Sequence, residues 1–481
     1  MSHPCPNGRE VTGAVSRSSF EGARPGGRDH AAAPPRERAL AVALIAGLHA
    51  WEALDSRGTP TVGCVVRLAD GSEGEAIVPS GASTGTHEAH ERRDGGERYG
   101  GKGVAGAVGS VLAEIAPAIV GLDAADQALV DTTMRELDGT ANLSRLGANA
   151  VLAASVATAL AAARSQRLPL WQALCPDLPP LLPLPMVNVV SGGAHAGGLI
   201  DVQDFLVVPV GASSFSEAIE WASRVRAATA EVLRERGHDT SLVADEGGLA
   251  APLPSNRAAL DVLLAGIQRS GLEPGVEAAI AVDIAATQFL ADGAYVLASE
   301  NRSLRAQELV DEIAAWVADY PIVSVEDALG EDDDAGWRYA SDRLAPIVQL
   351  LGDDLFVTSP PRLEAGIRGG IANAVLVKPN QVGTLTDAWR VVEIARAAGY
   401  ATVLSARSGE TEDSWLADLA VGWRTGQVKV GSTTRSERTA KWNRLLRIEA
   451  EEPGAAFAGA AVLAPLASHD SPTHLHPGGQ K

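Results

Sequence analysis

Three acidic residues, Asp283, Glu326 and Asp353, each follow a short apolar segment of the kind that forms a buried strand. If these strands are parallel neighbours, their carboxyl ends meet and the three carboxylates repel one another. A hard divalent cation relieves that repulsion, and ligands that are all oxygen suit Mg²⁺. The pattern therefore predicts a magnesium site. The alternative is that the acids cap helices or pair with arginine.

Lys378 ends the next apolar segment, and it is one of only five lysines among 40 basic residues. Unlike arginine, a desolvated lysine can lose its proton at biological pH. We expect burial and a neighbouring cation to lower the pKa of Lys378, which prepares a general base. A base beside Mg²⁺ fits removal of a proton α to a carboxylate. The alternative is a lysine that only pairs with one of the acids.

Further polar groups lie in loops between the predicted elements. Glu246 is flanked by glycine in the loop 245–248 and could act as a carboxyl acid. Arg407 with Ser408, and separately Lys429, follow later strands and could hold a phosphate or a carboxylate. The loop 79–85, rich in Ser, Thr and Gly, either closes over a phosphate or forms a surface turn. Each of these signals is weak by itself.

The elements that position these residues repeat along the chain. The polar residues that end the apolar strands stand at positions 283, 326, 353, 378 and 405, and amphipathic helical segments such as 304–320 and 385–399 fill the gaps. Strand–helix units in succession imply a parallel sheet, and five in a row favour a closed (β/α)8 barrel. Functional groups of such a barrel sit at the carboxyl ends of its strands. The fold class is therefore α/β.

Before the barrel, the pattern predicts a smaller α+β domain. Short strands within 45–78 indicate an antiparallel meander, helical segments follow, and a proline-rich connector spans 176–185. The expected domains are listed here in chain order: a flexible N-terminal extension at 1–42, an α+β cap domain at 43–178, the barrel domain at 179–470 and a flexible tail at 471–481.

Composition excludes several classes of partner. The formal net charge of −20 argues against nucleic acid and against an anionic membrane surface, because both attract basic proteins. The uncharged segment 146–163 is mostly alanine and fits a close-packed helix better than a membrane span. Three cysteines without a CxxC motif favour a reduced, cytoplasmic location.

Taken together, the motifs of residues 45–452 resemble those of the enolase (phosphopyruvate hydratase) family. The shared segments include LDSRGTPTV, PSGASTG, GGAHAGG, DEGG, VEDALGEDD, GDDLFVT, VLVKPNQVGTL, RSGETED, GQVKVGS and RSERTAKWNRLLRIE. The resemblance implies an enolase-like (β/α)8 barrel with an N-terminal α+β cap domain and a homodimer or larger assembly. It also implies dehydration of 2-phosphoglycerate, a small phosphorylated hydroxy acid, to phosphoenolpyruvate with two Mg²⁺ ions.

The resemblance also assigns roles to residues. Lys378 matches the base at C2, and Glu246 matches the acid that assists departure of the C3 hydroxyl. The residues that match metal ligands are Asp283, Glu326 and Asp353 for the first ion and Ser83 for the second. The residues that match substrate contacts are His195, Gln203, Asp204, Arg407, Ser408 and Lys429.

At some positions the chain departs from the family pattern. Asp204 stands where the family has glutamate, and Ala406 stands where it has histidine. Ser191 replaces asparagine, and Thr287-Gln288 replaces Ser-Glu. The residues for metal binding and proton abstraction are thus retained, whereas those near the leaving hydroxyl are altered.

Three functions fit this pattern. The first is an enolase. The second is a diverged homologue in phosphonate biosynthesis that resembles carboxyphosphonoenolpyruvate synthase, a transferase with a 2-phosphoglycerate-like substrate. The third is a non-catalytic binding protein with an enolase fold, and retention of Lys378, Glu246 and the three acids weighs against it.

Overall fold

The computed structural model describes residues 43–81 and 85–463. The expected extension at 1–42, the tail at 471–481 and Ser83 lie outside these described residues.

The described part of the chain begins with a three-stranded antiparallel sheet, as the meander pattern predicts. Its strands are β1 (Ile45–Leu54), β2 (Pro60–Leu68) and β3 (Glu73–Ile77), in that spatial order. Helix α4 (Ala148–Ser165) packs closely on this sheet, because a Cβ at Gly74 would lie 2.9 Å from the carbonyl carbon of Leu160. Small residues on both sides permit that approach.

Helix α4 is the one helix in the described part of the chain that is long and apolar enough to cross a membrane. Within the protein, 83% of it is buried, as expected for a core helix. The shorter elements around it are η1 (Arg98–Gly101), α1 (Ala105–Ser110), η2 (Val111–Ile115), α2 (Ala116–Ile119), α3 (Gln127–Asp138) and α5 (Leu170–Leu174).

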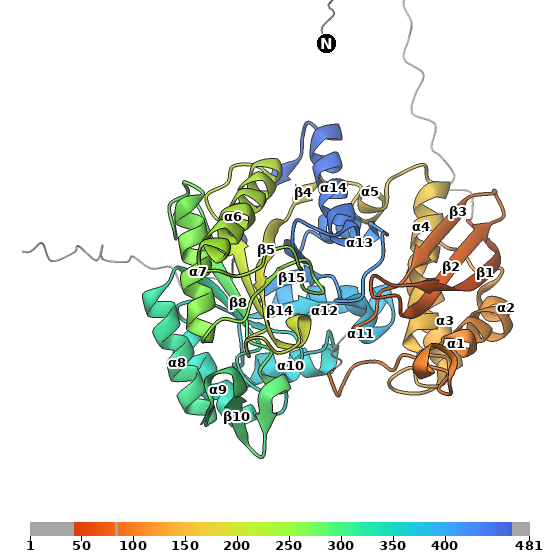
Figure 1. Cartoon of the computed structure of the whole chain (residues 1–481). Coiled ribbons are helices and arrows are strands. Elements are labelled where there is room, and N and C mark those ends of the chain that lie inside the picture. The colour runs from red at the N-terminus through yellow and green to blue at the C-terminus, as the bar shows by residue number, and fades with distance from the viewer. Residues whose placement is uncertain (1–42, 82–84, 464–481) are drawn as a thin grey trace, which may run out of the picture. The chain divides into compact units, whose positions relative to one another are not determined.

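Eight strands then close into a barrel, since the last of them, β16, pairs with the first, β5 (Figure 1). The barrel strands are β5 (Leu184–Ser191), β6 (Asp204–Val208), β8 (Ala279–Asp283), β12 (Ile322–Glu326), β13 (Gln349–Gly352), β14 (Ala374–Val377), β15 (Ala401–Ser405) and β16 (Gly426–Gly431). Alternate side chains of these strands, such as Leu184, Met186 and Leu206, form an apolar cluster of their own. The others join the larger core under the surrounding helices.

The five strands that were read from the sequence are parallel to one another, as expected. Strand β6 differs, because it runs antiparallel to both of its neighbours, β5 and β8. The reason is its short connection: residues 192–203 contain only the single turn η3 (Gly193–Ala196), so the chain returns as a hairpin. Two helices, α6 (Phe215–Glu235) and α7 (Asn256–Arg269), then follow before β8.

The remaining helices are α8 (Ala306–Asp319), α9 (Asp334–Leu344), α10 (Pro360–Gly369), α11 (Pro379–Val382), α12 (Leu385–Ala397), α13 (Trp415–Gly422) and α14 (Ser436–Glu451). The minor elements are β4 (Leu181–Leu182), β7 (Leu249–Ala250), η4 (Ala286–Phe289), β9 (Leu290–Ala291), β10 (Ala294–Leu297), η5 (Ala298–Glu300), β11 (Arg302–Leu304), β17 (Ala456–Phe457) and η6 (Gly459–Val462).

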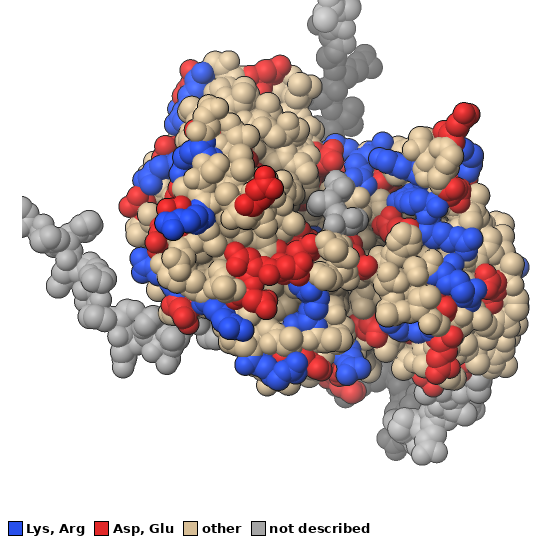
Figure 2. Space-filling model, turned by 90° about the horizontal axis from the view of Figure 1, so that it is seen from below, with Lys and Arg blue, Asp and Glu red and all other residues tan. Residues whose placement is uncertain are grey.

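The segment after β3 reaches the carboxyl end of the barrel. Ser80 and Gly409 exchange two backbone hydrogen bonds, of 2.9 and 3.0 Å, and a Cβ at Gly409 would lie 2.7 Å from the Ser80 carbonyl oxygen. This contact, together with that of Glu88 and Arg407, brings the segments on both sides of residues 82–84 beside the loop that carries Arg407 and Ser408. On the face seen in Figure 2, acidic side chains gather in one band with Lys and Arg around it.

Candidate active site

A pocket opens at the carboxyl ends of the barrel strands. The predicted site residues that line it are His195, Gln203, Glu246, Asp283, Asp353, Lys378, Arg407, Ser408 and Lys429. Glu326 and Asp204 lie behind this surface, where they contact Lys429 and His195 respectively. The structure therefore brings together every predicted site residue that it describes.

Lys429 lies between two of the predicted metal ligands. Its Nζ is 2.7 Å from Asp283 Oδ2 and 2.8 Å from both carboxylate oxygens of Glu326. Burial lowers the pKa of Lys429, but these two carboxylates outweigh it and raise the pKa well above its ordinary value. Burial and the Asp283 charge raise the pKa of Glu326. Lys429 is therefore a fixed positive charge.

Lys378 forms an ion pair with Asp353, the third predicted ligand. Both side chains are almost buried, and Asp353 also accepts a 2.9 Å hydrogen bond from Gln381. Burial lowers the pKa of Lys378, but the Asp353 carboxylate raises it more. Burial by itself is therefore not enough to lower the pKa of Lys378 here, because the Asp353 carboxylate faces the ammonium group directly, and the lowering by a neighbouring cation stays a prediction.

The donor set nevertheless fits a divalent cation. Three buried carboxylates, Asp283, Glu326 and Asp353, form ion pairs with two lysines, Lys429 and Lys378, which leaves one negative charge in excess within this group. Among the described residues, the ligand atoms of these three carboxylates do not all lie within 4.8 Å of one another. Two other groups meet that distance: His195 with Asp204 and Glu246, and Asp327 with Asp353 and Asp354. Burial and the Asp353 charge raise the pKa of Asp354 to about 7. The carboxylates of Asp327, Asp353 and Asp354 are therefore crowded, and a hard cation relieves such crowding of oxygen ligands.

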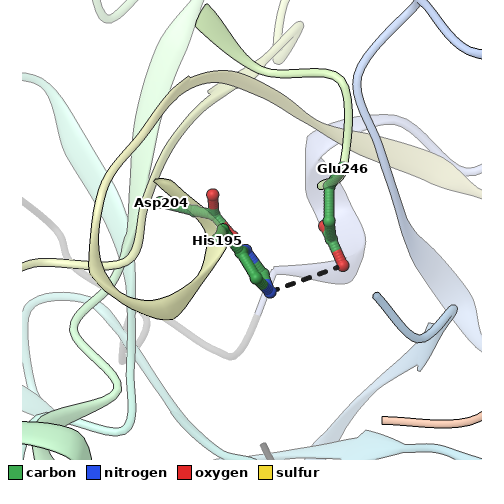
Figure 3. Close-up of side chains that lie close together, drawn as sticks. All are labelled: His195, Asp204 and Glu246. Carbon is green, nitrogen blue, oxygen red and sulfur yellow. Dashed lines mark hydrogen bonds and ion pairs between the residues drawn. The ribbon is translucent and has the colours of Figure 1, made fainter. Parts of the chain in front are cut away.

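On the opposite side of the pocket, His195 lies between two carboxylates, Asp204 and Glu246 (Figure 3). Its Nδ1 is 2.8 Å from Asp204 Oδ2, and its Nε2 is 4.0 Å from Glu246 Oε1. Burial lowers the pKa of His195, but the two carboxylates raise it to about 9. Burial raises the pKa of Glu246, but His195 and Arg438 outweigh it and hold the pKa below its ordinary value. His195 is therefore charged at neutral pH.

A chain of side-chain amides leads from the loop after β5 to Asp283. The Ala194 N–H donates to Gln288 Oε1 at 3.0 Å, the Gln288 amide donates to Gln203 Oε1, and Gln203 Nε2 donates to Asp283 Oδ2 at 3.1 Å. Because a backbone N–H only donates and a carboxylate only accepts, the donor and acceptor of each hydrogen bond in this series are fixed. Gln288 thus holds Gln203 with its donor on the predicted metal ligand.

Arg407 is held by a carboxylate from the segment after β3. Its guanidinium nitrogens lie 3.0 and 3.2 Å from the two oxygens of Glu88, and Nη1 donates to Asn380 Oδ1 at 3.0 Å. Burial lowers the pKa of Arg407, but Glu88 raises it further. An anionic ligand that bound Arg407 would compete with Glu88.

Sequence reasoning missed three residues that support the site. Glu88 follows the Ser- and Gly-rich loop by only three positions, and Gln288 was noticed only as a departure from the family motif. Asp327 accepts hydrogen bonds from the backbone N–H groups of Asp353 and Asp354, at 2.9 and 2.8 Å. Its own backbone has a left-handed φ of 44°. The Glu-Asp and Asp-Asp pairs in the sequence are the signal that could have revealed this contact.

Comparisons with known proteins match this architecture. Residues 45–174 match the family model described as enolase, N-terminal domain, and residues 179–466 match that of the enolase, C-terminal TIM barrel domain. An enolase of Acidothermus cellulolyticus is 51% identical over 422 residues, which cover 88% of this chain and 98% of that protein. The chain belongs to the enolase family.

Proposed function

We propose that the protein is an enolase that removes water from 2-phosphoglycerate to give phosphoenolpyruvate. The observation that carries this proposal is one pocket with Lys378 among carboxylates on one side and the His195–Glu246 pair on the other. Dehydration needs one group that takes the C2 proton and another that protonates the departing C3 hydroxyl. No oxidation or reduction takes place.

Lys378 is the base in this proposal. It acts in its neutral form, so it must first give up the proton that Asp353 stabilises. Lys429 keeps its charge between Asp283 and Glu326, and it offsets negative charge on the substrate carboxylate.

Asp283, Glu326 and Asp353 would hold one Mg²⁺, and Ser83 would belong to the site of a second. When bound, such a cation neutralises the charge that develops on the carboxylate as the C2 proton leaves.

The leaving hydroxyl faces the other side of the pocket. Glu246 is the proposed acid, and charged His195, 4.0 Å away, keeps a proton beside it. Asp204 holds the His195 ring through Nδ1. Because the lowered pKa of Glu246 leaves it ionised, it takes this proton from His195 and passes it to the C3 hydroxyl, which leaves as water, while the C2 proton stays on Lys378.

The phosphate group would occupy the place that Glu88 now takes on Arg407, with Ser408 in the same pocket. Gln203 would contact the substrate from beside Asp283. We also propose the domain limits 43–178 and 179–470, a homodimeric or larger assembly and a cytoplasmic location, as expected for this family.

Ala406 favours one second candidate, the phosphonate-pathway transferase. Its buried methyl group lines the pocket where the family has an imidazole. A pocket altered on the side of the leaving group could divert the deprotonated intermediate to another acceptor.

The test is to incubate the protein with 2-phosphoglycerate and Mg²⁺ and to follow the ultraviolet absorbance of the enol product. A turnover that EDTA abolishes supports the proposal. Absence of product, beside an active enolase as positive control, overturns it. Exchange of the C2 proton for deuterium without product supports the second candidate instead.

A further inference from the structure

The carboxylate of Asp204 is completely enclosed by hydrogen-bond donors. Its Oδ2 faces His195 Nδ1 at 2.8 Å, and its Oδ1 accepts from Ser191 Oγ at 2.8 Å and from the Asn188 side chain. Asp204, Ser191 and Asn188 are all fully buried. With two donors on Oδ1, only Oδ2 is left for His195, so the carboxylate cannot turn without losing a contact.

The Ser191 hydroxyl can donate its proton only to Asp204. It accepts a 3.0 Å hydrogen bond from Asn188 Nδ2, so its own proton goes to Asp204. The strand register places Ser191 directly opposite Asp204 in the β5–β6 pair. On the far side, Gly248 closes the space, because a Cβ there would collide with Ser191 Oγ and lie 2.9 Å from Asn188 Oδ1.

Positions 191 and 204 are also two of the places where this chain departs from the family motif. The structure puts the two departures in direct contact. Residues that share a buried hydrogen bond respond to each other's substitution, so the two changes form one unit.

We propose that Ser191 is a positioning residue for loss of the C3 hydroxyl. Through Asp204 it holds the His195 ring with Nε2 toward Glu246, and it has no part in removal of the C2 proton by Lys378. This role rests on the proposed dehydration. Its physical basis is the geometry of one carboxylate, because without the hydroxyl Asp204 keeps Asn188 alone on Oδ1 and can turn away from the ring.

The first experiment uses Ser191→Ala in the full chain with Mg²⁺, and measures dehydration and C2 deuterium exchange in parallel. We expect dehydration to fall roughly tenfold or more, as for the loss of a hydrogen bond to a charged group, and exchange to stay within about twofold. The control is Ser324→Ala, which removes another buried barrel hydroxyl, bonded to Gln349. We expect this control to leave both rates unchanged.

If both rates of Ser191→Ala fall together, or neither falls, the proposed role is overturned. If the wild-type protein exchanges deuterium but does not dehydrate, the proposed function is overturned, and the role of Ser191 with it.

A second experiment tests the coupling and does not depend on a single variant. Ser191→Asn and Asp204→Glu are each expected to lower the rate of dehydration. The double variant restores the family pattern at both positions. We expect it to recover, on a logarithmic scale, at least half of the summed loss of the two single variants. Losses that simply add in the double variant overturn the coupling.

Discussion

Lys378 and Asp353 form an almost buried ion pair at the carboxyl ends of two neighbouring strands, β14 and β13. The pair explains how a charged lysine is tolerated in the pocket, and it keeps the base protonated until Asp353 is otherwise engaged. Replacement of Lys378 is therefore expected to affect catalysis, whereas replacement of the more deeply buried Lys429 is expected to affect stability.

Replacement of Lys378 by alanine should remove the base. We expect both dehydration and C2 deuterium exchange to fall about 10²–10⁴-fold, the usual contribution of a general base. Lys102→Ala, which removes an exposed lysine in another part of the chain, serves as the control. Exchange that persisted in Lys378→Ala would show that another group takes the proton.

Lys429→Met should destabilise the protein, because Asp283 and Glu326 would remain buried without their partner. Loss of one member of a buried ion pair costs about 3–5 kcal/mol of unfolding free energy. We expect that loss in EDTA and a smaller one in millimolar Mg²⁺, because a cation can replace the ammonium charge. Urea unfolding of the wild type and the variant in EDTA and in Mg²⁺ measures this loss of unfolding free energy. Equal losses in the two buffers would argue against a cation at these carboxylates.

The pH dependence of stability should report on His195. Its pKa in the folded protein, about 9, is above the ordinary 6.5, so protonation stabilises the folded state. That contribution is complete below pH 6.5 and is lost as the pH rises through about 9. We expect the difference in unfolding free energy between the wild type and His195→Gln to shrink over this window. A constant or growing difference would contradict the assignment of the charge.

Glu88→Gln should strengthen binding of inorganic phosphate, because it removes the carboxylate that occupies Arg407. The remaining amide still fills the space, so the pocket keeps its shape. We expect the inhibition constant of phosphate to fall several-fold, whereas the control Glu97→Gln, at an exposed position in the cap domain, should leave it unchanged. Weaker inhibition in Glu88→Gln would mean that Glu88 supports the anion site.

Much of the fold could be predicted because its strands end in conspicuous residues. Asp283, Glu326 and Lys378 fall at or directly after the ends of their strands, as the spacing predicted. The reversed strand β6 could not be predicted in this way, since a five-residue apolar strand carries no signal of its direction.

The site was less predictable than the fold. The residue types in the pocket follow from the motifs, but their pairing does not. Lys429 is distant in sequence from Asp283 and Glu326, and only the closed barrel brings the three together. The support from Gln288 depends on the backbone N–H of Ala194, which no residue pattern reveals. For Asp327, the neighbouring acidic pairs in the sequence were a signal, but its partners are backbone N–H groups that only the structure shows.

The reversal of β6 changes which residue of that strand reaches the catalytic rim. In the parallel strands, the last residue or the one after it lies at this rim. In β6, the first residue, Asp204, lies directly behind the rim, and Gln203, one position earlier, lines the pocket. The connection 192–203 therefore starts and finishes at the same rim, where the Asp201 and Val202 N–H groups donate to the side chain of Asn256, the first residue of α7, at 3.0 and 2.9 Å. Because backbone N–H groups make this contact with α7, substitutions of His195 or Gln203 within the connection leave it in place. Altered chemistry would therefore arise most readily in this hairpin.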